Sequence, residues 1–385
     1  MTKIQQGMKV LMQIRHDAFT KIGGDTIQML NTAKELKKLG VYVDISTSFM
    51  PDISKYDIIH VFNLETIEYS YFQILNAKKY NKPVAFSVIY WELNEQKQKQ
   101  MMSSVQPKKY SELTKWAKNN AHYIVFLPYM LSVYAKIKND KRYKCPEFFR
   151  LASKLGIKTL KKMALLNADI LLPNSYTEIE LLFKNFNIKK DFMKIVNGVN
   201  SDFQTGNPDS FKSKYKIDKE FALCVARIEQ RKNQLKLIQA VKNTNIPLVL
   251  VGRGEEPYFT LCKKSADSNV TFIGPLNSKE LANAYKAAKV HILPSWLETP
   301  GLASLEAALA GCVIVSTKYG STEEYFKDTV FYCIPDSIES IRDALIKGWN
   351  STPSHELIDL IKREYTWQQA AIQTLAAYNK ILFKS

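Results

Sequence analysis

The chain lacks an uninterrupted apolar run of the roughly 18 residues that a membrane-spanning helix needs. Its first residues, Met1 to Gln5, also lack the apolar core of a secretory signal peptide. Both absences argue against an integral membrane or exported protein. We therefore expect a soluble or peripheral protein, in the cytoplasm or at the inner face of the cytoplasmic membrane.

Cysteine and histidine are scarce, with five residues of each type in 385. No two cysteines form a CxxC pair, and three of the five lie in apolar strand-like runs, where free thiols usually pack as small hydrophobic groups. The scattered histidines, and the lack of a DxD sequence in a donor-like loop, predict no metal site and no cofactor. The cysteines are Cys145, Cys224, Cys262, Cys312 and Cys333.

Positive charge is abundant and uneven. The formal net charge is +17, and residues 97–162 hold 16 lysines and arginines against Glu112, Asp140 and Glu147, a net charge of +13. Aromatic residues such as Trp116 are interleaved with these charges. Such a surface suits an anionic membrane, a nucleic acid or an acidic substrate.

Strand and helix patterns alternate along the first half, which predicts a parallel sheet with helices on both faces. A strand at residues 9–14 leads through Gly23 and Gly24 to a helix at 26–39, for which Asp25 is the expected N-cap. Further strands are expected at 41–46, 56–62, 83–90 and 168–175, and further helices at 70–79 and 176–186.

The same alternation restarts after residues 197–219, where turn and polar residues cluster. We predict an α/β fold of two doubly wound, Rossmann-like domains that face a cleft. The first domain is expected at residues 1–200 with an insert at 95–162, and the second at 207–360. The second half carries expected strands at 221–226, 247–252, 270–273 and 290–293, and helices at 234–242, 257–265, 278–288 and 366–383.

Two carboxylates, Glu298 and Glu306, flank a glycine and the start of an Ala/Leu-rich helix that ends at Gly311. One carboxylate just after a strand and another early in the next helix can both face one crevice. The amides of the helix N-terminus between them attract a phosphate. The pair therefore suits the hydroxyls of a sugar and a ribose, with a diphosphate between them.

This segment resembles the signature of retaining glycosyltransferases of the GT-B type, family 4, which is Glu, seven residues, Glu, then a small-residue helix and a glycine. Asn197-Gly198-Val199-Asn200 and Pro173-Asn174-Ser175, with Glu178 following, resemble two further segments of that family. The matched pieces lie within residues 8–94 and 163–383. The resemblance implies a C-terminal helix, residues 366–385, that crosses back to the first domain.

Arg227 and Lys232, five residues apart after a strand, match the family's donor-phosphate clamp, and Arg231 is a competitor for either role. Fixed cations there would stabilise the charge that develops on a departing nucleoside diphosphate. With Glu298 they are the expected catalytic residues. The resemblance implies donor-binding roles for Gly23, Gly24, Gly252, Arg253, Pro275, Leu276, Thr299, Pro300, Gly301, Leu302 and Glu306.

Many relatives carry a histidine just after the fourth strand, but this chain has Tyr90, Trp91 and Glu92 there. We expect these three residues to line the acceptor site, where Glu92 could orient or deprotonate an acceptor hydroxyl. In this fold class the leaving phosphate is usually argued to take the proton. The missing histidine therefore does not argue against activity.

The leading hypothesis is transfer of a sugar from a nucleoside diphosphate sugar to a hydroxyl of a glycan in O-antigen, capsule or exopolysaccharide synthesis. A uridine donor is favoured and guanosine is the alternative. We expect a lipid-linked acceptor on a polyprenyl diphosphate and contact with an anionic membrane through residues 97–162. Two alternatives stay open, a catalytically degenerate partner subunit and a polyanion-binding protein. Nucleic acid is disfavoured because no matching motif occurs.

Overall fold

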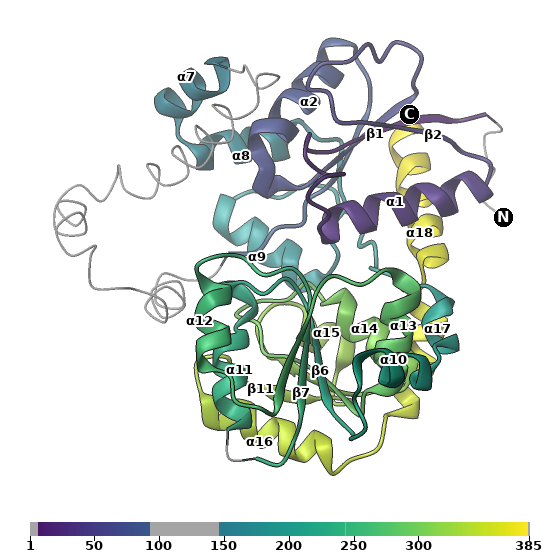
Figure 1. Cartoon of the computed structure of the whole chain (residues 1–385). Coiled ribbons are helices and arrows are strands. Elements are labelled where there is room, and N and C mark those ends of the chain that lie inside the picture. The colour runs from purple at the N-terminus through teal and green to yellow at the C-terminus, as the bar shows by residue number, and fades with distance from the viewer. Residues whose placement is uncertain (1–6, 93–145, 243, 384–385) are drawn as a thin grey trace, which may run out of the picture.

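The computed structural model describes residues 7–92, 146–242 and 244–383, and it contains two parallel sheets (Figure 1). The first sheet has the order β2-β1-β3-β4-β5, and every neighbouring pair is parallel. Its inner strands are largely apolar because helices cover both faces, whereas the edge strand at residues 42–46 also carries Asp44 and Ser46. The strands are β1 (Lys9–Gln13), β2 (Tyr42–Ser46), β3 (Ile58–Phe62), β4 (Val84–Ser87) and β5 (Ile170–Leu171).

Two groups of helices sandwich the first sheet. Apolar side chains of α2, α7, α8 and α9 pack against one face, and those of α1 and α18 pack against the other. A short 3-10 turn, η1 (Leu64–Thr66), precedes α2. The helices are α1 (Gly24–Lys38), α2 (Ile67–Lys79), α7 (Pro146–Leu155), α8 (Ile157–Asn167), α9 (Tyr176–Phe186) and α18 (Trp367–Leu382).

The second sheet has the order β11-β10-β9-β6-β7-β8 and is also parallel. Side chains of α11, α12 and α16 fill one face, and those of α13, α14 and α17 fill the other. The strands are β6 (Ala222–Val225), β7 (Leu248–Val251), β8 (Val270–Ile273), β9 (Val290–Leu293), β10 (Val313–Thr317) and β11 (Phe331–Cys333). The α-helices are α10 (Pro208–Tyr215), α11 (Gln234–Val241), α12 (Tyr258–Ser265), α13 (Ser278–Ala287), α14 (Leu302–Ala310), α15 (Thr322–Phe326), α16 (Ile338–Trp349) and α17 (His355–Glu364).

The C-terminal helix α18 returns to the first domain, where it lies beside α1 (Figure 1). Its buried Tyr378 hydroxyl hydrogen-bonds His60 Nδ1 of β3 at 2.7 Å. Burial lowers the pKa of His60 to about 3, so this histidine is neutral and structural. Gly198 runs so close to the start of α18 that a Cβ there would lie 2.3 Å from Trp367 N. The predicted fold class, including the returning helix, is confirmed.

Several local predictions were wrong for identifiable reasons. Gly23, not Asp25, is the N-cap of α1, because the helix begins at Gly24; Asp25 lies in its first turn, where it accepts from Arg15 Nε at 2.9 Å. The strand expected at 83–90 ends at Ser87, and Ile89 turns the chain with a φ of +46°. The polar stretch at 197–219 contains the helix α10, whose N-cap is Asn207. Of the insert predicted at 95–162, residues 95–145 lie outside the described chain.

Candidate active site

Four loops at the carboxyl edge of the second sheet carry the predicted donor-site residues. Arg227 follows β6, and its half-exposed guanidinium makes ion pairs of 3.2 Å with Glu229 and with Glu255. Lys232 ends the short 3-10 turn η4 (Gln230–Lys232) in the same loop, and only 14% of its side chain is exposed. The loop therefore presents one accessible cation and one nearly buried cation.

Lys232 forms an ion pair with Glu298, whose side chain is 5% exposed. Burial opposes ionisation of Glu298, but the nearby charges of Lys232 and Arg231 outweigh it and lower the pKa of this carboxyl. Burial lowers the pKa of Lys232, and Glu298 acts in the opposite direction. The fold thus brings together two of the predicted catalytic residues, Lys232 and Glu298, which are 66 residues apart in sequence. They form an ion pair that is largely shielded from water.

Glu298 is held in place by its backbone. Its amide donates to Tyr319 O at 3.1 Å, and the Ser321 amide donates to Glu298 O at 3.0 Å. Between these two bonds the chain passes so close that a Cβ at Gly320 would lie 1.9 Å from Glu298 O. The loop after β10 therefore clamps the loop after β9, which fixes the carboxylate in one position.

Helix α14 begins four residues after Glu298 and has no acidic residue in its first turn and no side-chain cap. Gly301, its N-cap, has a φ of +91°, a conformation that favours glycine, and a Cβ there would lie 3.4 Å from Glu298 Oε2. Leu302 opens the helix, and Thr299 and Pro300 complete the connection. A helix N-terminus beside Lys232 is a favourable place for a phosphate.

Glu306 lies one turn into α14, where Tyr285 of α13 donates to its Oε2 at 3.0 Å. Burial raises the pKa of Glu306 to about 7, and the bond from Tyr285 offsets only part of this effect. The two glutamates of the predicted pair therefore differ in charge state. Glu298 is ionised beside a lysine, whereas Glu306 titrates near neutrality.

The glycine turn after β7 approaches the Arg227 loop. Gly252 has a φ of +149°, and a Cβ there would lie 1.9 Å from Ala226 O, so only glycine fits. The next residue, Arg253, is exposed, and its carbonyl accepts from the Ile228 amide at 2.8 Å. Pro275 and Leu276 follow β8 at the next position along the sheet, where the proline is exposed and the leucine half-buried.

In the first domain, Gly23 and Gly24 begin α1. A Cβ at Gly23 would lie 2.8 Å from Asp25 Oδ1, whereas a Cβ at Gly24 would meet nothing within 4 Å. The Arg15 Nε donates to Asp25 Oδ2 at 2.9 Å, and Asn63 Nδ2 donates to the same oxygen at 3.0 Å. This network fixes the turn that carries both glycines.

The predicted acceptor residues are placed differently from one another. Tyr90 is 3% exposed, and its hydroxyl donates to Glu92 Oε2 at 2.7 Å and accepts from Asn185 Nδ2 at 3.0 Å. Trp91 is half-buried, with no hydrogen-bond partner for its Nε1 among the described residues, and Glu92 is exposed. Tyr90 therefore holds this loop against α9, and the two residues after it are the accessible ones.

Residues that the sequence patterns did not single out complete the site. Glu229 and Glu255 bind Arg227, and Tyr285 binds Glu306. Arg231, named above as a competitor for either cationic role, bridges two loops, because its Nη1 donates to Leu297 O at 3.0 Å. Nothing in the sequence showed which acidic residues would pair with Arg227 and Arg231.

A family comparison bears on this arrangement. The family model of glycosyl transferases group 1 matches residues 207–363, the domain that carries Arg227, Lys232 and both glutamates. The second domain is therefore similar to the group 1 glycosyl transferases, and the match does not extend to the first domain.

Similar proteins of known sequence are named glycosyltransferases. The chain is 27% identical over 217 residues to an uncharacterised glycosyltransferase of Methanocaldococcus jannaschii, a match that covers 50% of the chain and 55% of that protein. It is 24% identical over 172 residues to the O-antigen chain mannosyltransferase B of Escherichia coli, covering 41% and 45% of the two chains. The chain thus spans about half the length of these relatives.

Solved structures confirm the GT-B fold over the whole chain. Sucrose-phosphate synthase of Thermosynechococcus elongatus superimposes with a TM-score of 0.71 at 15% identity, covering 98% of this chain and 100% of that one. HepE of Anabaena, solved in complex with UDP and glucose, gives a TM-score of 0.68 at 14% identity, covering 97% and 100%.

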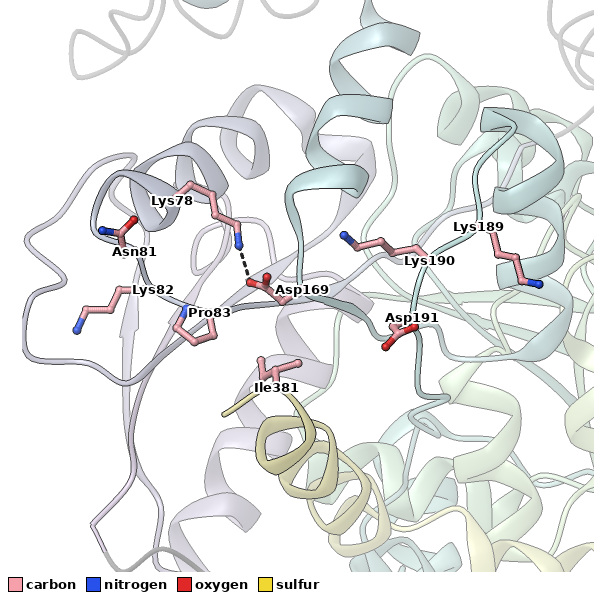
Figure 2. A pocket seen from close by; sticks show the side chains of 9 residues that line it. All are labelled: Lys78, Asn81, Lys82, Pro83, Asp169, Lys189, Lys190, Asp191 and Ile381. Atoms are coloured by element: carbon pink, nitrogen blue, oxygen red, sulfur yellow. Dashed lines mark hydrogen bonds and ion pairs between the residues drawn. The ribbon is translucent and has the colours of Figure 1, made fainter. Parts of the chain in front are cut away.

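One cavity, of about 900 Å³, lies away from these loops, at the amino ends of β4 and β5. Figure 2 shows that Lys82 and Lys189 point outward at opposite ends of it, while Lys78 is bound to Asp169 at 2.6 Å. These lysines do not converge on one point. In the described part of the chain, no group of three His, Cys, Asp or Glu residues could hold a metal ion, and no helix is long and apolar enough to cross a membrane.

Proposed function

We propose that this protein is a retaining glycosyltransferase that moves a sugar from a nucleoside diphosphate sugar to a hydroxyl of a glycan. The observation that carries the proposal is the buried Lys232–Glu298 pair beside the uncapped N-terminus of α14. A buried ion pair is a poor device for stability alone, because its desolvation offsets most of its attraction. In the proposed donor complex, the sugar and the diphosphate would both contact this ion pair.

We assign roles to the main donor-site residues of the second domain. Arg227 and Lys232 bind the diphosphate, Arg227 as a planar fork and Lys232 as a point charge. The amides of Gly301 and Leu302 approach the same group. Glu298 accepts from hydroxyls of the sugar, and Glu306 from those of the ribose, while the turns at Gly252–Arg253 and Pro275–Leu276 border the base.

In the proposed reaction the bond between the anomeric carbon and the phosphate oxygen breaks, and a bond from that carbon to the acceptor oxygen forms on the same face. The acceptor proton passes to the leaving phosphate. The charge that develops on that phosphate is stabilised by Arg227, Lys232 and the helix N-terminus. No side chain of the first domain has to act as the base.

Uridine is the favoured base of the donor, and guanosine is the alternative. HepE, a structural neighbour, was solved with UDP and with UDP-glucose. The sequence relatives from Escherichia coli are mannosyltransferases. The first observation supports a uridine donor, whereas the second leaves the sugar and the base open.

For the acceptor we propose a glycan in O-antigen, capsule or exopolysaccharide synthesis, carried on a polyprenyl diphosphate. The O-antigen mannosyltransferase among the relatives supports this class. Trp91 and Glu92 would meet the acceptor. The basic segment 97–162 would contact the anionic inner leaflet, each lysine or arginine near the surface contributing about 1 kcal/mol. Equal co-sedimentation with neutral and anionic vesicles would contradict this contact.

Hydrolysis of nucleotide sugars tests the proposal. UDP-glucose and GDP-mannose are incubated with the full chain, and release of the nucleoside diphosphate is measured. We expect release from one donor, and a rate of release that is at least a hundredfold lower in Glu298→Gln and in Arg227→Ala. A catalytically degenerate partner subunit would bind a nucleotide without hydrolysis. A polyanion-binding protein would bind heparin and show no preference among nucleotides.

A further inference from the structure

The two domains meet at a buried tyrosine. Tyr325 of α15, in the second domain, is 1% exposed. Its hydroxyl donates to Asn174 O at 2.7 Å and accepts from the Asn197 amide at 3.0 Å. Both partners are backbone groups at the carboxyl edge of the first domain. One hydroxyl thus fixes the distance between two segments of one domain and a helix of the other.

On the first-domain side the hydrogen bonds continue through a buried carboxylate. Glu178 is fully buried, and its Oε2 accepts from the Asn174 amide at 2.6 Å. Its other oxygen, Oε1, accepts from the Tyr90 amide at 2.6 Å. Asn174 follows β5 and Tyr90 follows β4, so Glu178 ties together the loops after two adjacent strands. The loop that carries Trp91 and Glu92 is therefore positioned from the domain boundary.

On the second-domain side, α15 follows directly on the segment that clamps Glu298. Tyr319 O and the Ser321 amide bind the backbone of Glu298 at 3.1 and 3.0 Å, and α15 begins at the next residue, Thr322. A shift of Tyr325 would therefore move the clamp. The side chain of Asn197 adds a longer bond of 3.5 Å to Thr299 O, beside the same carboxylate.

A separate set of contacts holds the domains together. The Glu324 carboxylate accepts from the amides of Tyr176 and Thr177 at the N-terminus of α9, each at 3.1 Å, and from Lys194 Nζ at 3.1 Å. A carboxylate at a helix N-terminus is favourably placed. Because Glu324 holds the two domains together, removal of the Tyr325 hydroxyl should change their registration without separating them.

We infer that Tyr325 is a positioning residue that holds the loop after β4 at a fixed place relative to Glu298. Its hydroxyl is therefore needed for turnover but not for nucleotide binding. The inference rests on the proposed function, because turnover means reaction of the donor held at Glu298. Misplacement of a reacting group by about 1 Å can lower a rate by about a hundredfold. The proposed contacts of the base and the diphosphate with Arg227, Lys232 and the N-terminus of α14 lie within the second domain, so the affinity for the nucleotide should change little.

The test compares Tyr325→Phe with Tyr365→Phe in the full chain. The rings of the two tyrosines lie 4.6 Å apart, and no hydrogen bond of the Tyr365 hydroxyl occurs among the described residues, which makes Tyr365→Phe the matched control. UDP and GDP binding is measured by titration calorimetry, and hydrolysis of UDP-glucose and GDP-mannose gives kcat and KM. Amide hydrogen exchange is followed at Tyr90 and Asn197.

For Tyr325→Phe we expect at least a tenfold lower kcat, a nucleotide Kd within twofold of the wild-type value, and at least tenfold faster exchange at both amides. Tyr365→Phe should change none of these. Glu178→Gln should reproduce the lower kcat and the faster exchange at Tyr90. Unchanged exchange, unchanged kcat, or parallel losses of kcat and affinity would each overturn the inference. A wild-type chain that binds neither nucleotide would instead overturn the proposed function, and exchange alone would then decide the role of Tyr325.

Discussion

Replacement of Lys232 by methionine should destabilise the protein strongly and in a pH-dependent manner. The substitution keeps an unbranched side chain, one atom shorter, but leaves the Glu298 carboxylate, 5% exposed, without its partner. Removal of one member of a buried ion pair typically costs about 3–5 kcal/mol. Lys232 is 14% exposed and Arg231 also acts on Glu298, so we expect a value near the lower end, about 3 kcal/mol.

The sign of the pH dependence follows from the direction of the pKa shift. In the wild type the pKa of Glu298 is lowered, so its contribution to stability is present above its unfolded-state pKa and is lost as the pH falls. Without Lys232, Arg231 remains as the nearby charge that opposes the effect of burial on that pKa, so the ionised carboxylate loses most of its compensation and destabilises the fold. The difference between the wild type and Lys232→Met should therefore be largest near pH 8 and shrink toward pH 4.5.

Urea denaturation followed by tryptophan fluorescence measures this difference. Lys232→Met/Glu298→Gln should recover at least half of the lost stability, because no charge is then buried alone. Lys279→Met, on the exposed side of α13, is the control and should stay within about 0.5 kcal/mol of the wild type. A loss below 1 kcal/mol for Lys232→Met, or no recovery in the double variant, would refute the ion-pair interpretation.

Three further predictions concern the fold around the site. Burial raises the pKa of Glu178 to about 7. The free energy of unfolding of the wild type should therefore fall by about 3 kcal/mol between pH 4.5 and 7 relative to that of Glu178→Gln. The same pH dependence of both proteins in urea denaturation would contradict this. Gly252→Ala should cost about 3 kcal/mol in urea melts, whereas Gly274→Ala, whose Cβ would meet nothing within 4 Å, should be neutral. Tyr378→Phe should cost about 1–2 kcal/mol, because it removes the partner of a buried histidine nitrogen, and an equal melting temperature would argue against that bond.

The regular parts of the fold could be predicted because buried parallel strands are unbroken apolar runs between turn residues. The strands at Val270–Ile273 and Val290–Leu293 and the helix at Tyr176–Phe186 agree with the sequence prediction at both ends. Helix α10 was missed because its sequence, Pro208–Tyr215, is polar and buries only Phe211. Short helices of that kind are stabilised by tertiary contacts rather than by an apolar stripe.

The donor-site residues could be proposed from spacing and family resemblance, but their partners could not. The pairing of Lys232 with Glu298 spans 66 residues, and the bond from Tyr325 to Asn174 spans 151. Contacts between residues so far apart in sequence depend on how the strands and the two sheets are placed in space. The spacing of apolar residues along the chain does not reveal that placement. The burial of Tyr90 was missed for the same reason, because its hydroxyl binds Asn185, 95 residues away.

We propose that the loops around Arg227, Lys232 and Glu298 bind a nucleoside diphosphate. Titration calorimetry of UDP, GDP and ADP into the full chain tests it most directly, with Arg227→Ala as the variant because that half-exposed side chain should not affect stability. We predict that one nucleotide binds and that its Kd rises about tenfold or more in Arg227→Ala. The absence of binding by all three nucleotides, or equal binding to the variant, would contradict the account.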